Sequence, residues 1–340
     1  MVLFGSKSAK CGGDNKWPTI IRCPRIAQAA CQILRTHRTD ECALSVDYIE
    51  RVNRAIDLVI GNLARPLSLE EVSKAADFSP FHFHRVFKAL LGETLNQFVK
   101  RQRLERALYL MSHAPQRSLT DVALDCGFSS SSDFSRSFKQ RYGHPPSEFD
   151  IETFRNGRRE EFERALSNHY GPGRITSLPA GQNPDGFEVK LRNLPARRVA
   201  YIRVFEPYRV GVAQAACERL VAWAIKRGLA DGQWLGYMWD EPEIVALADC
   251  RYDVALVVDD IDPEGEIGRF DFPPMCVAEV VLSGDLALEA RAIDWLYRTW
   301  LPRSGYVPDN QPAFEAWIGR PFAHGSEHFE LACQLPIKPS

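Results

Sequence analysis

Residues 68–92 of the chain are repeated at residues 118–143, and this duplication limits the possible folds more than any other feature. The offset between the copies is 50 residues up to Phe78 and 51 from Phe83 onward, so one residue is inserted between them in a turn. Two copies of one local pattern predict two copies of one supersecondary unit. The shared residues are Ser68/Ser118, Leu69/Leu119, Val72/Val122, Phe78/Phe128, Phe83/Phe134, Arg85/Arg136, Phe87/Phe138, Lys88/Lys139 and Gly92/Gly143.

Each copy has the pattern of a short helix, a tight turn and a second helix. Ser68 and Glu71 have the spacing of a capping box at the start of the first helix. Gly127 stands in the second turn, where a positive φ costs least for glycine. Phenylalanines four residues apart lie on one face of a helix, which predicts a buried stripe and leaves the opposite face free. These pairs are Phe83 with Phe87 and Phe134 with Phe138.

A helix-turn-helix unit places its second helix in the DNA major groove, with the first residues of that helix nearest the base edges. Arg85 and Arg136 occupy matching positions, and arginine binds guanine or clamps a phosphate. One isolated copy is equally consistent with a helical hairpin in an all-α core, but two copies favour DNA binding. The candidate DNA-binding residues are Phe81, His84, Arg85, Ser131, Ser132, Asp133 and Arg136.

Residues 47–150 resemble the DNA-binding domain of the AraC/XylS transcription regulators, most clearly in Gly127–Ser130 and in the closing Gly143–Phe149 segment. The resemblance implies two helix-turn-helix units on one linker helix, here Leu95–Met111, that read two adjacent major-groove segments. The domain has 14 Lys and Arg against 13 Asp and Glu, so we expect modest non-specific DNA affinity.

The remaining amino-terminal segment, residues 1–46, carries no clear pattern, and we expect a disordered extension or a start codon placed too far upstream. Its cysteines are separated by 12, 8 and 11 positions, which fits no usual zinc spacing, so we predict no metal site and no cofactor. No apolar run approaches the roughly 20 residues that cross a membrane, and no signal peptide is evident, so we expect a cytoplasmic protein. The cysteines of residues 1–46 are Cys11, Cys23, Cys31 and Cys42.

Residues 151–185 read as a charged helix followed by a Gly- and Pro-rich linker, and residues 186–340 as a second domain. In this domain the expected order is strand, helix and two strands, repeated with variation, which predicts an antiparallel α+β sheet with two helices on one face. With 16 Lys and Arg against 23 Asp and Glu, the domain suits a cationic molecule or a protein surface better than DNA. The expected strands are 187–194, 198–205, 234–239, 252–258, 277–282, 313–318 and 329–335, and the expected helices are 210–227 and 286–301.

This second domain resembles the GyrI-like effector-binding domains of multidrug-responsive regulators. The matching segments are Leu235–Tyr237, Asp240–Pro242, Arg251–Asp253, Trp295–Leu296, Trp300–Pro302 and Pro312–Trp317. The resemblance implies a groove that holds flat hydrophobic ligands, often cations, against aromatic walls and a buried glutamate.

Glu315 matches that glutamate, and strand alternation places it on the same face as Trp317. A buried carboxylate needs a partner, and a cation stacked on aromatic rings would supply one; an arginine of the domain is the alternative partner. Trp239, Tyr201 and Tyr237 are the further candidates for the ligand-binding wall.

The leading hypothesis is a transcription regulator that binds double-stranded promoter DNA, a small-molecule effector and RNA polymerase. A second hypothesis is a hydrolase that uses Glu315 as a general base, although we find no hydrolase motif. A third is a protein-interaction module, whose pocket would be filled by its own side chains.

Overall fold

The computed structural model describes residues 41–340 except 171–177, 179–180 and 323–327. Most of the expected amino-terminal extension, residues 1–40, therefore lies outside the described residues. The first described helix, α2 (Glu41–Ile60), begins six residues before the expected start of the DNA-binding domain at Asp47. Residues 41–46 are thus part of that helix.

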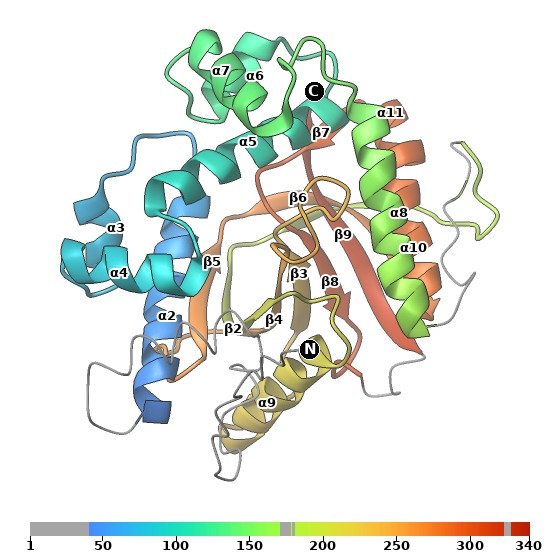
Figure 1. The fold of residues 1–340 in the computed structure, drawn as a ribbon. Helices are drawn as coiled ribbons and strands as arrows, with labels where there is room; N and C mark the ends of the chain where they lie inside the picture. The colour runs from blue at the N-terminus through green and yellow to red at the C-terminus, as the bar shows by residue number, and fades with distance from the viewer. Residues whose placement is uncertain (1–40, 171–177, 179–180, 323–327) are drawn as a thin grey trace, which may run out of the picture.

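The helical domain contains both predicted helix-turn-helix units, joined by the predicted linker helix (Figure 1). Helix α5 (Leu95–His113) runs between them, and the two units lie at its opposite ends. The first unit consists of α3 (Leu69–Ala75) and α4 (Pro80–Leu91), and the second of α6 (Leu119–Asp125) and α7 (Ser131–Tyr142).

Serine side chains cap all four helices of the two units, and Ser68 is at the predicted start of the first helix. The capping box predicted for Ser68 and Glu71 is only half formed. The Ser68 hydroxyl accepts from the Glu71 amide at 3.1 Å, but the Glu71 carboxylate binds the Arg65 guanidinium. A complete box is found instead at the start of α5, between Thr94 and Gln97.

The turns of the two helix-turn-helix units have different residues, Asp77 and Gly127, at their matching position, and the reason is steric. Asp77 occupies the first turn with φ of 49°, and Gly127 occupies the second with φ of 81°. A Cβ atom on Gly127 would lie 2.2 Å from the Leu63 carbonyl oxygen and 3.0 Å from the Arg103 side chain. Arg103 donates to that same carbonyl at 3.0 Å, so the second turn packs directly against the segment that precedes the first unit.

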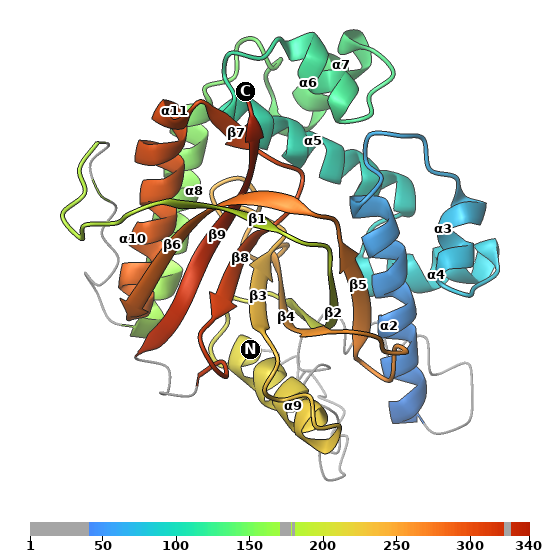
Figure 2. The same ribbon diagram turned by 180° about the vertical axis from the view of Figure 1, so that it is seen from behind.

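The carboxy-terminal domain is built on one antiparallel sheet whose strand order is β1-β6-β9-β8-β3-β4-β2-β5, with β7 pairing with β9. Seven of its strands correspond to the predicted ones, and β5 and β7 were not predicted. Figure 2 shows the sheet from behind. The strands are β1 (Lys190–Leu194), β2 (Arg197–Phe205), β3 (Trp234–Met238), β4 (Arg251–Val258), β5 (Gly268–Phe272), β6 (Met275–Gly284), β7 (Tyr306–Pro308), β8 (Ala313–Trp317) and β9 (Phe329–Pro339).

Helices α9 (Val212–Lys226) and α10 (Leu286–Trp295) pack into one core with one face of the sheet, as predicted. The predicted second helix continues past Trp295 through a π-helical turn, Leu296–Trp300, into α11 (Leu301–Ser304). The opposite face of the sheet carries a separate aromatic core. Alternation along each strand therefore assigns its side chains to two different environments.

Helix α8 (Ile151–Tyr170) links the two domains and runs alongside α10 in both views (Figures 1 and 2). It follows the second helix-turn-helix unit directly and precedes the sheet domain in the chain. Its first residues pack into the core of that unit. Helix α8 thus begins in the core of the second helix-turn-helix unit and continues alongside α10 of the second domain.

Gly127→Ala should lower the free energy of unfolding by about 2 to 4 kcal/mol, because both the positive φ and the contact with the Leu63 carbonyl penalise a Cβ atom. The matched control is Gly143→Ala, where φ is 85° and nothing lies within 4 Å of the added Cβ. That control should cost only about 1 kcal/mol. Urea denaturation measures both, and equal losses would contradict the steric explanation.

Candidate DNA-binding face and effector site

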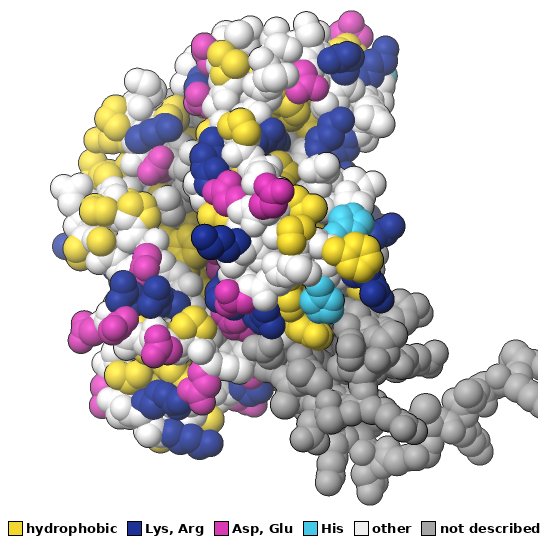
Figure 3. All heavy atoms as spheres, turned by 90° about the vertical axis from the view of Figure 1, so that its left-hand side faces the viewer, with side chains coloured by type: hydrophobic (Ala, Val, Ile, Leu, Met, Phe, Trp, Pro, Cys, Tyr) yellow, Lys and Arg dark blue, Asp and Glu magenta, His cyan; other side chains and the backbone are white. Residues whose placement is uncertain are grey.

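The predicted DNA-binding residues lie at the starts of the second helices, α4 and α7, and all except the half-buried Asp133 are exposed. Phe81 is 75% exposed, an unusual state for phenylalanine in a folded domain. The Arg85 guanidinium lies 6.0 Å from the Phe81 ring centroid. Figure 3 shows Lys, Arg and His side chains along the right-hand edge of this face, over the two helical units.

Asp133 has a local role as well. Its carboxylate accepts from the Ser129 hydroxyl at 3.1 Å, and its amide donates to the capping Ser130 hydroxyl at 3.1 Å. The phenylalanine stripe that holds each second helix is buried as predicted. Burial of that stripe leaves Arg85 and Arg136 on the outward side of their helices.

A cavity of about 520 Å³ lies between the sheet, α10 and α8. Its lining is largely apolar and includes Tyr208, Met238 and Phe322 from the sheet domain. Glu315 and Trp317, both predicted ligand-binding residues, line this cavity, which brings together a carboxylate and an indole as strand alternation predicted.

Glu315 is 9% exposed and is held by neutral donors rather than by an arginine. The Tyr252 hydroxyl donates to its carboxylate at 2.6 Å, and Trp317 and Glu289 also hydrogen-bond to it. Burial raises the pKa of Glu315 despite these hydrogen bonds. Burial and the nearby Glu315 raise the pKa of Glu289 well above its usual range, so this pair of carboxyl groups retains a proton.

Tyr252 and Glu289 were not among the predicted site residues. Glu289 lies three residues after Leu286 on α10, and both line the cavity. An acidic residue on the inward stripe of a helix is the sequence signal that would have identified it. Tyr252 carries no comparable signal, because a tyrosine in a strand is usually part of the core.

Tyr201, Tyr237 and Trp239 lie on the other side of the sheet from Glu315. They belong to the second aromatic core, where Tyr201 and Tyr237 are almost fully buried. Gly236 on β3 pairs with Glu315, so both residues face the same side of the sheet. Tyr237 and Trp239 come one and three residues after Gly236, and alternation therefore points their side chains to the opposite side. These three aromatic residues are therefore placed apart from Glu315 and outside the cavity lining.

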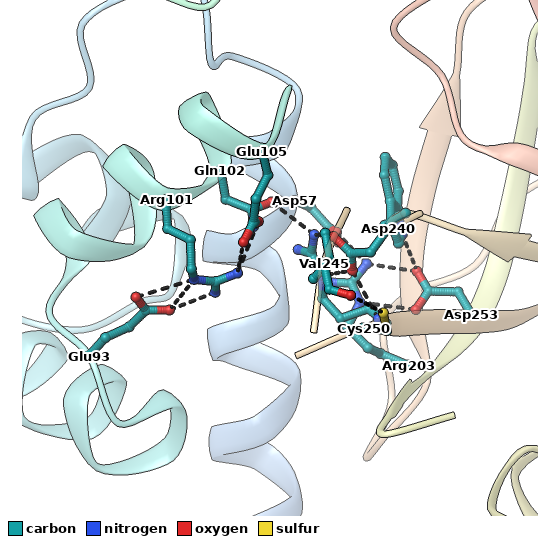
Figure 4. Close-up of polar contacts among 12 residues, drawn as sticks. Asp57, Glu93, Arg101, Gln102, Glu105, Arg203, Asp240, Val245, Cys250 and Asp253 are labelled. Atoms are coloured by element: carbon teal, nitrogen blue, oxygen red, sulfur yellow. Dashed lines mark hydrogen bonds and ion pairs between the residues drawn. The ribbon is translucent and has the colours of Figure 1, made fainter. Parts of the chain in front are cut away.

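The hydroxyl of Tyr201 instead contacts the DNA-binding domain. It donates to the Asp57 carboxylate on α2 at 2.5 Å. Arg203, the next residue on the same face of β2, donates to Asp57 at 2.8 Å and to Asp253 on β4 at 2.7 Å. The Trp239 indole donates to the same Asp253 carboxylate at 2.7 Å. Figure 4 shows Asp57, Arg203 and Asp253 of this cluster at the junction of the two domains.

A second buried arginine reaches the linker helix between the two helix-turn-helix units. Arg251 binds Asp240 within its own domain and donates to the Gln102 side chain on α5 at 2.8 Å. Gln102 donates in turn to Glu105 at 2.9 Å, and Glu105 pairs with Arg101 (Figure 4). Glu105 also pairs with Arg141 at 3.1 Å. Since Arg141 lies on α7, hydrogen bonds and ion pairs extend from the sheet domain to the second helix of the second helix-turn-helix unit.

Helix α8 provides a third connection. Arg155 binds Glu241 at 2.9 Å and Glu243 at 2.5 Å, and Arg159 binds Glu243 and Asp294. His113, at the end of α5, lies 2.9 Å from Glu241. Burial opposes ionisation of Glu241, but His113 and Arg155 outweigh it and lower its pKa to about 2. All five of these contacts with carboxylates join α5 or α8 to the second domain.

The chain matches a model of the helix-turn-helix domain over residues 72–150 and a model of the GyrI-like small molecule binding domain over residues 187–338. It is 32% identical over 161 residues to the DNA gyrase inhibitor of Edwardsiella piscicida, which covers 45% of this chain and 99% of that protein. It is 35% identical over 105 residues to the probable transcriptional regulator LumQ of Photobacterium leiognathi, which covers 30% of this chain and 42% of LumQ.

The match to the transcriptional regulator Rob of Salmonella typhimurium is 32% identical over 93 residues and covers 26% of this chain and 32% of Rob. The chain thus spans less than half the length of LumQ and about a third of Rob. A crystal structure of an AraC-type transcriptional regulator from Chromobacterium violaceum matches at 28% identity, with a TM-score of 0.28, over 29% of this chain and 87% of that one.

The chain belongs to the AraC family of helix-turn-helix transcription regulators and carries a GyrI-like small-molecule binding domain. That family consists of DNA-binding transcription regulators.

Two further features concern only the described part of the chain. No helix there is long and apolar enough to cross a membrane. Within the same ranges, no three His, Cys, Asp or Glu side chains are grouped so that they could hold a metal ion. Cys11, Cys23 and Cys31 lie outside those ranges.

Burial raises the pKa of Glu105 to about 7 despite the opposing charge of Arg101. The folded chain therefore binds this proton more tightly than the unfolded chain, in which a glutamate has a pKa of about 4.3. The contribution of this proton to the free energy of unfolding is therefore complete below a pH of about 4.3 and is lost as the pH rises through the folded-state pKa of about 7. The glutamine in Glu105→Gln stays neutral at every pH, so this variant does not lose stability in this way. The free energy of unfolding of Glu105→Gln minus that of the unchanged protein should therefore rise by about 1 to 2 kcal/mol from about pH 5 to pH 7.5.

Urea denaturation at the two pH values measures this difference. Glu148→Gln is the matched control, because it removes one carboxylate from an exposed position of the same domain. A Glu105→Gln chain whose relative stability stays constant or falls over this interval would contradict the assignment.

Proposed function

We propose that this protein is a one-component regulator that binds a specific promoter sequence with both helix-turn-helix units and senses a flat, hydrophobic cation. The observation that carries the proposal is the buried Glu315 carboxylate beside the Trp317 indole in a cavity that helix α8 also lines. RNA polymerase is the partner expected at a promoter, and the cytoplasm is the compartment expected for such a protein.

The exposed side chains at the starts of α4 and α7 support sequence-specific binding to duplex DNA. Arg85 and Arg136 sit at equivalent positions of the two units. Arginine at this position of a recognition helix binds guanine O6 and N7 or a phosphate. With two equivalent units on one rigid helix, a single chain has two DNA-reading elements, whereas many helix-turn-helix proteins must dimerise to obtain two.

Arg85→Ala and Arg136→Ala should each weaken binding to the specific duplex by about 1 to 3 kcal/mol if each arginine reads a base. A duplex selected from a random library by the intact chain serves as the probe, and fluorescence anisotropy at fixed salt gives the affinities. Arg192→Ala is the control, because Arg192 lies on β1 of the other domain. Unchanged affinity in both arginine variants would reject this docking model.

The electrostatics of the cavity support a cationic ligand. Glu315 and Glu289 lie together in an apolar surrounding and retain a proton between them. A cation placed against the aromatic side chains would stabilise both ionised carboxylates and release that proton. A neutral ligand gains no such interaction, so charge should discriminate between ligands of the same shape.

The cavity also bears on the two alternatives. An interaction module whose pocket is filled by its own side chains would leave no open space beside Glu315, whereas about 520 Å³ is available there. Hydrolysis would need a base that activates water, and the Glu315 carboxylate already accepts hydrogen bonds from Tyr252, Glu289 and Trp317. Both observations favour the sensor.

Tetraphenylphosphonium should raise the melting temperature of the intact chain by about 3 °C or more at saturating concentration. Glu315→Gln should abolish most of that shift, and Glu330→Gln, on the surface of β9, should retain it. Mass spectrometry of the recovered compound completes the experiment. Chemically altered compound would favour the hydrolase, and an equal shift in Glu315→Gln would reject the proposed role of this carboxylate.

A further inference from the structure

Helix α8 lies between the two segments that match known domains, residues 72–150 and 187–338. Its amino-terminal part belongs to the DNA-binding domain. The Phe154 ring lies 5.3 Å from the Phe149 ring and 5.7 Å from the Tyr142 ring, centroid to centroid. Phe149 and Tyr142 surround Phe138, the buried residue of the second DNA-reading helix. The start of α8 is therefore fixed by the core of that unit.

The carboxy-terminal part of α8 belongs to the effector cavity. Phe162, Glu163 and Leu166 line it, and Leu166 is only 6% exposed. The Phe162 ring meets the Tyr208 ring of the sheet domain at 5.0 Å in an edge-to-face arrangement. A ligand that fills this space must contact α8 as well as the sheet domain.

The middle of α8 contributes charge to the same cavity. Arg155 and Arg159 are lining residues, and each binds carboxylates that also line it. Arg159 holds Glu243 and Asp294, which would otherwise give the cavity a stronger negative potential. Since these groups are largely removed from solvent, their mutual interactions are weakly screened.

We propose that α8 is part of the ligand-binding site, with Phe162 as an apolar wall and Arg159 as the residue that sets how strongly a cation is preferred. This inference rests on the proposed function, because it concerns the same cavity. It adds that ligand selection depends on residues outside the GyrI-like domain. A ligand in this site touches the helix whose other end is packed in the second helix-turn-helix unit.

Isothermal titration calorimetry of the intact chain tests the inference with two probes of similar shape, the cation tetraphenylphosphonium and the neutral triphenylphosphine oxide. Phe162→Ala should weaken whichever probe binds by about tenfold, because the ligand loses an aromatic contact. Phe162→Leu keeps an apolar side chain and should lose less. Arg159→Gln should strengthen binding of the cation by about fivefold relative to the neutral probe, since it removes a nearby positive charge.

Arg158→Gln is the matched control, because Arg158 lies on the same helix but outside the cavity lining, where it pairs with Glu161 at 3.0 Å. It should change neither affinity. Weakening of the probes by Arg158→Gln to the same degree as by Phe162→Ala would overturn the inference, since the effect would then come from the stability of the helix.

The other outcomes separate the two proposals. Tight binding of the cation that Phe162→Ala leaves unchanged would overturn the role of α8 and keep the proposed function. Binding of the neutral probe alone, weakened by Phe162→Ala, would support α8 as a wall and overturn the preference for cations. Failure of both probes to bind the unchanged chain would overturn both proposals.

Discussion

Two buried arginines on neighbouring strands, Arg203 on β2 and Arg251 on β4, hold the DNA-binding domain against the sheet. Their side chains are 0% and 5% exposed, and each binds one acidic residue of its own domain and one polar residue of the other. A buried charge that loses its partner costs several kcal/mol. Separation of the domains would expose Asp57 and Gln102 and deprive both arginines of a partner, so the contact opposes free rotation of one domain against the other.

This constraint connects the rest of the structure. Gln102 lies on the helix that joins the two helix-turn-helix units, and the chain of contacts from it continues through Glu105 to Arg141 on α7. Helix α8 joins the same unit to the cavity wall. The proposed ligand and DNA sites therefore lie on elements that are packed together. A ligand that binds one arrangement of these elements more tightly than another changes the DNA affinity to the extent of that difference.

The helical domain was largely predictable, because the repeat fixes the spacing of local features: caps, apolar stripes and a turn. Strand alternation was equally sufficient to place Glu315 with Trp317. Alternation within a strand does not give the register between strands, and it is this register that places Tyr201 and Tyr237 on the opposite face from Glu315. Contacts between domains could not be predicted, since Asp57 and Arg203 lie 146 residues apart and no local pattern pairs them. The missed strands are short: β5 has five residues and β7 has three.

Thermodynamic linkage gives the most direct test of the claim that the two sites are coupled. The affinity of the intact chain for tetraphenylphosphonium is measured with and without a saturating amount of its selected duplex. The coupled structure predicts that the duplex changes the affinity for the cation, and linkage then requires the cation to change the affinity for the duplex by the same factor. Equal affinity for the cation in the presence and absence of the duplex would show that the two sites are independent.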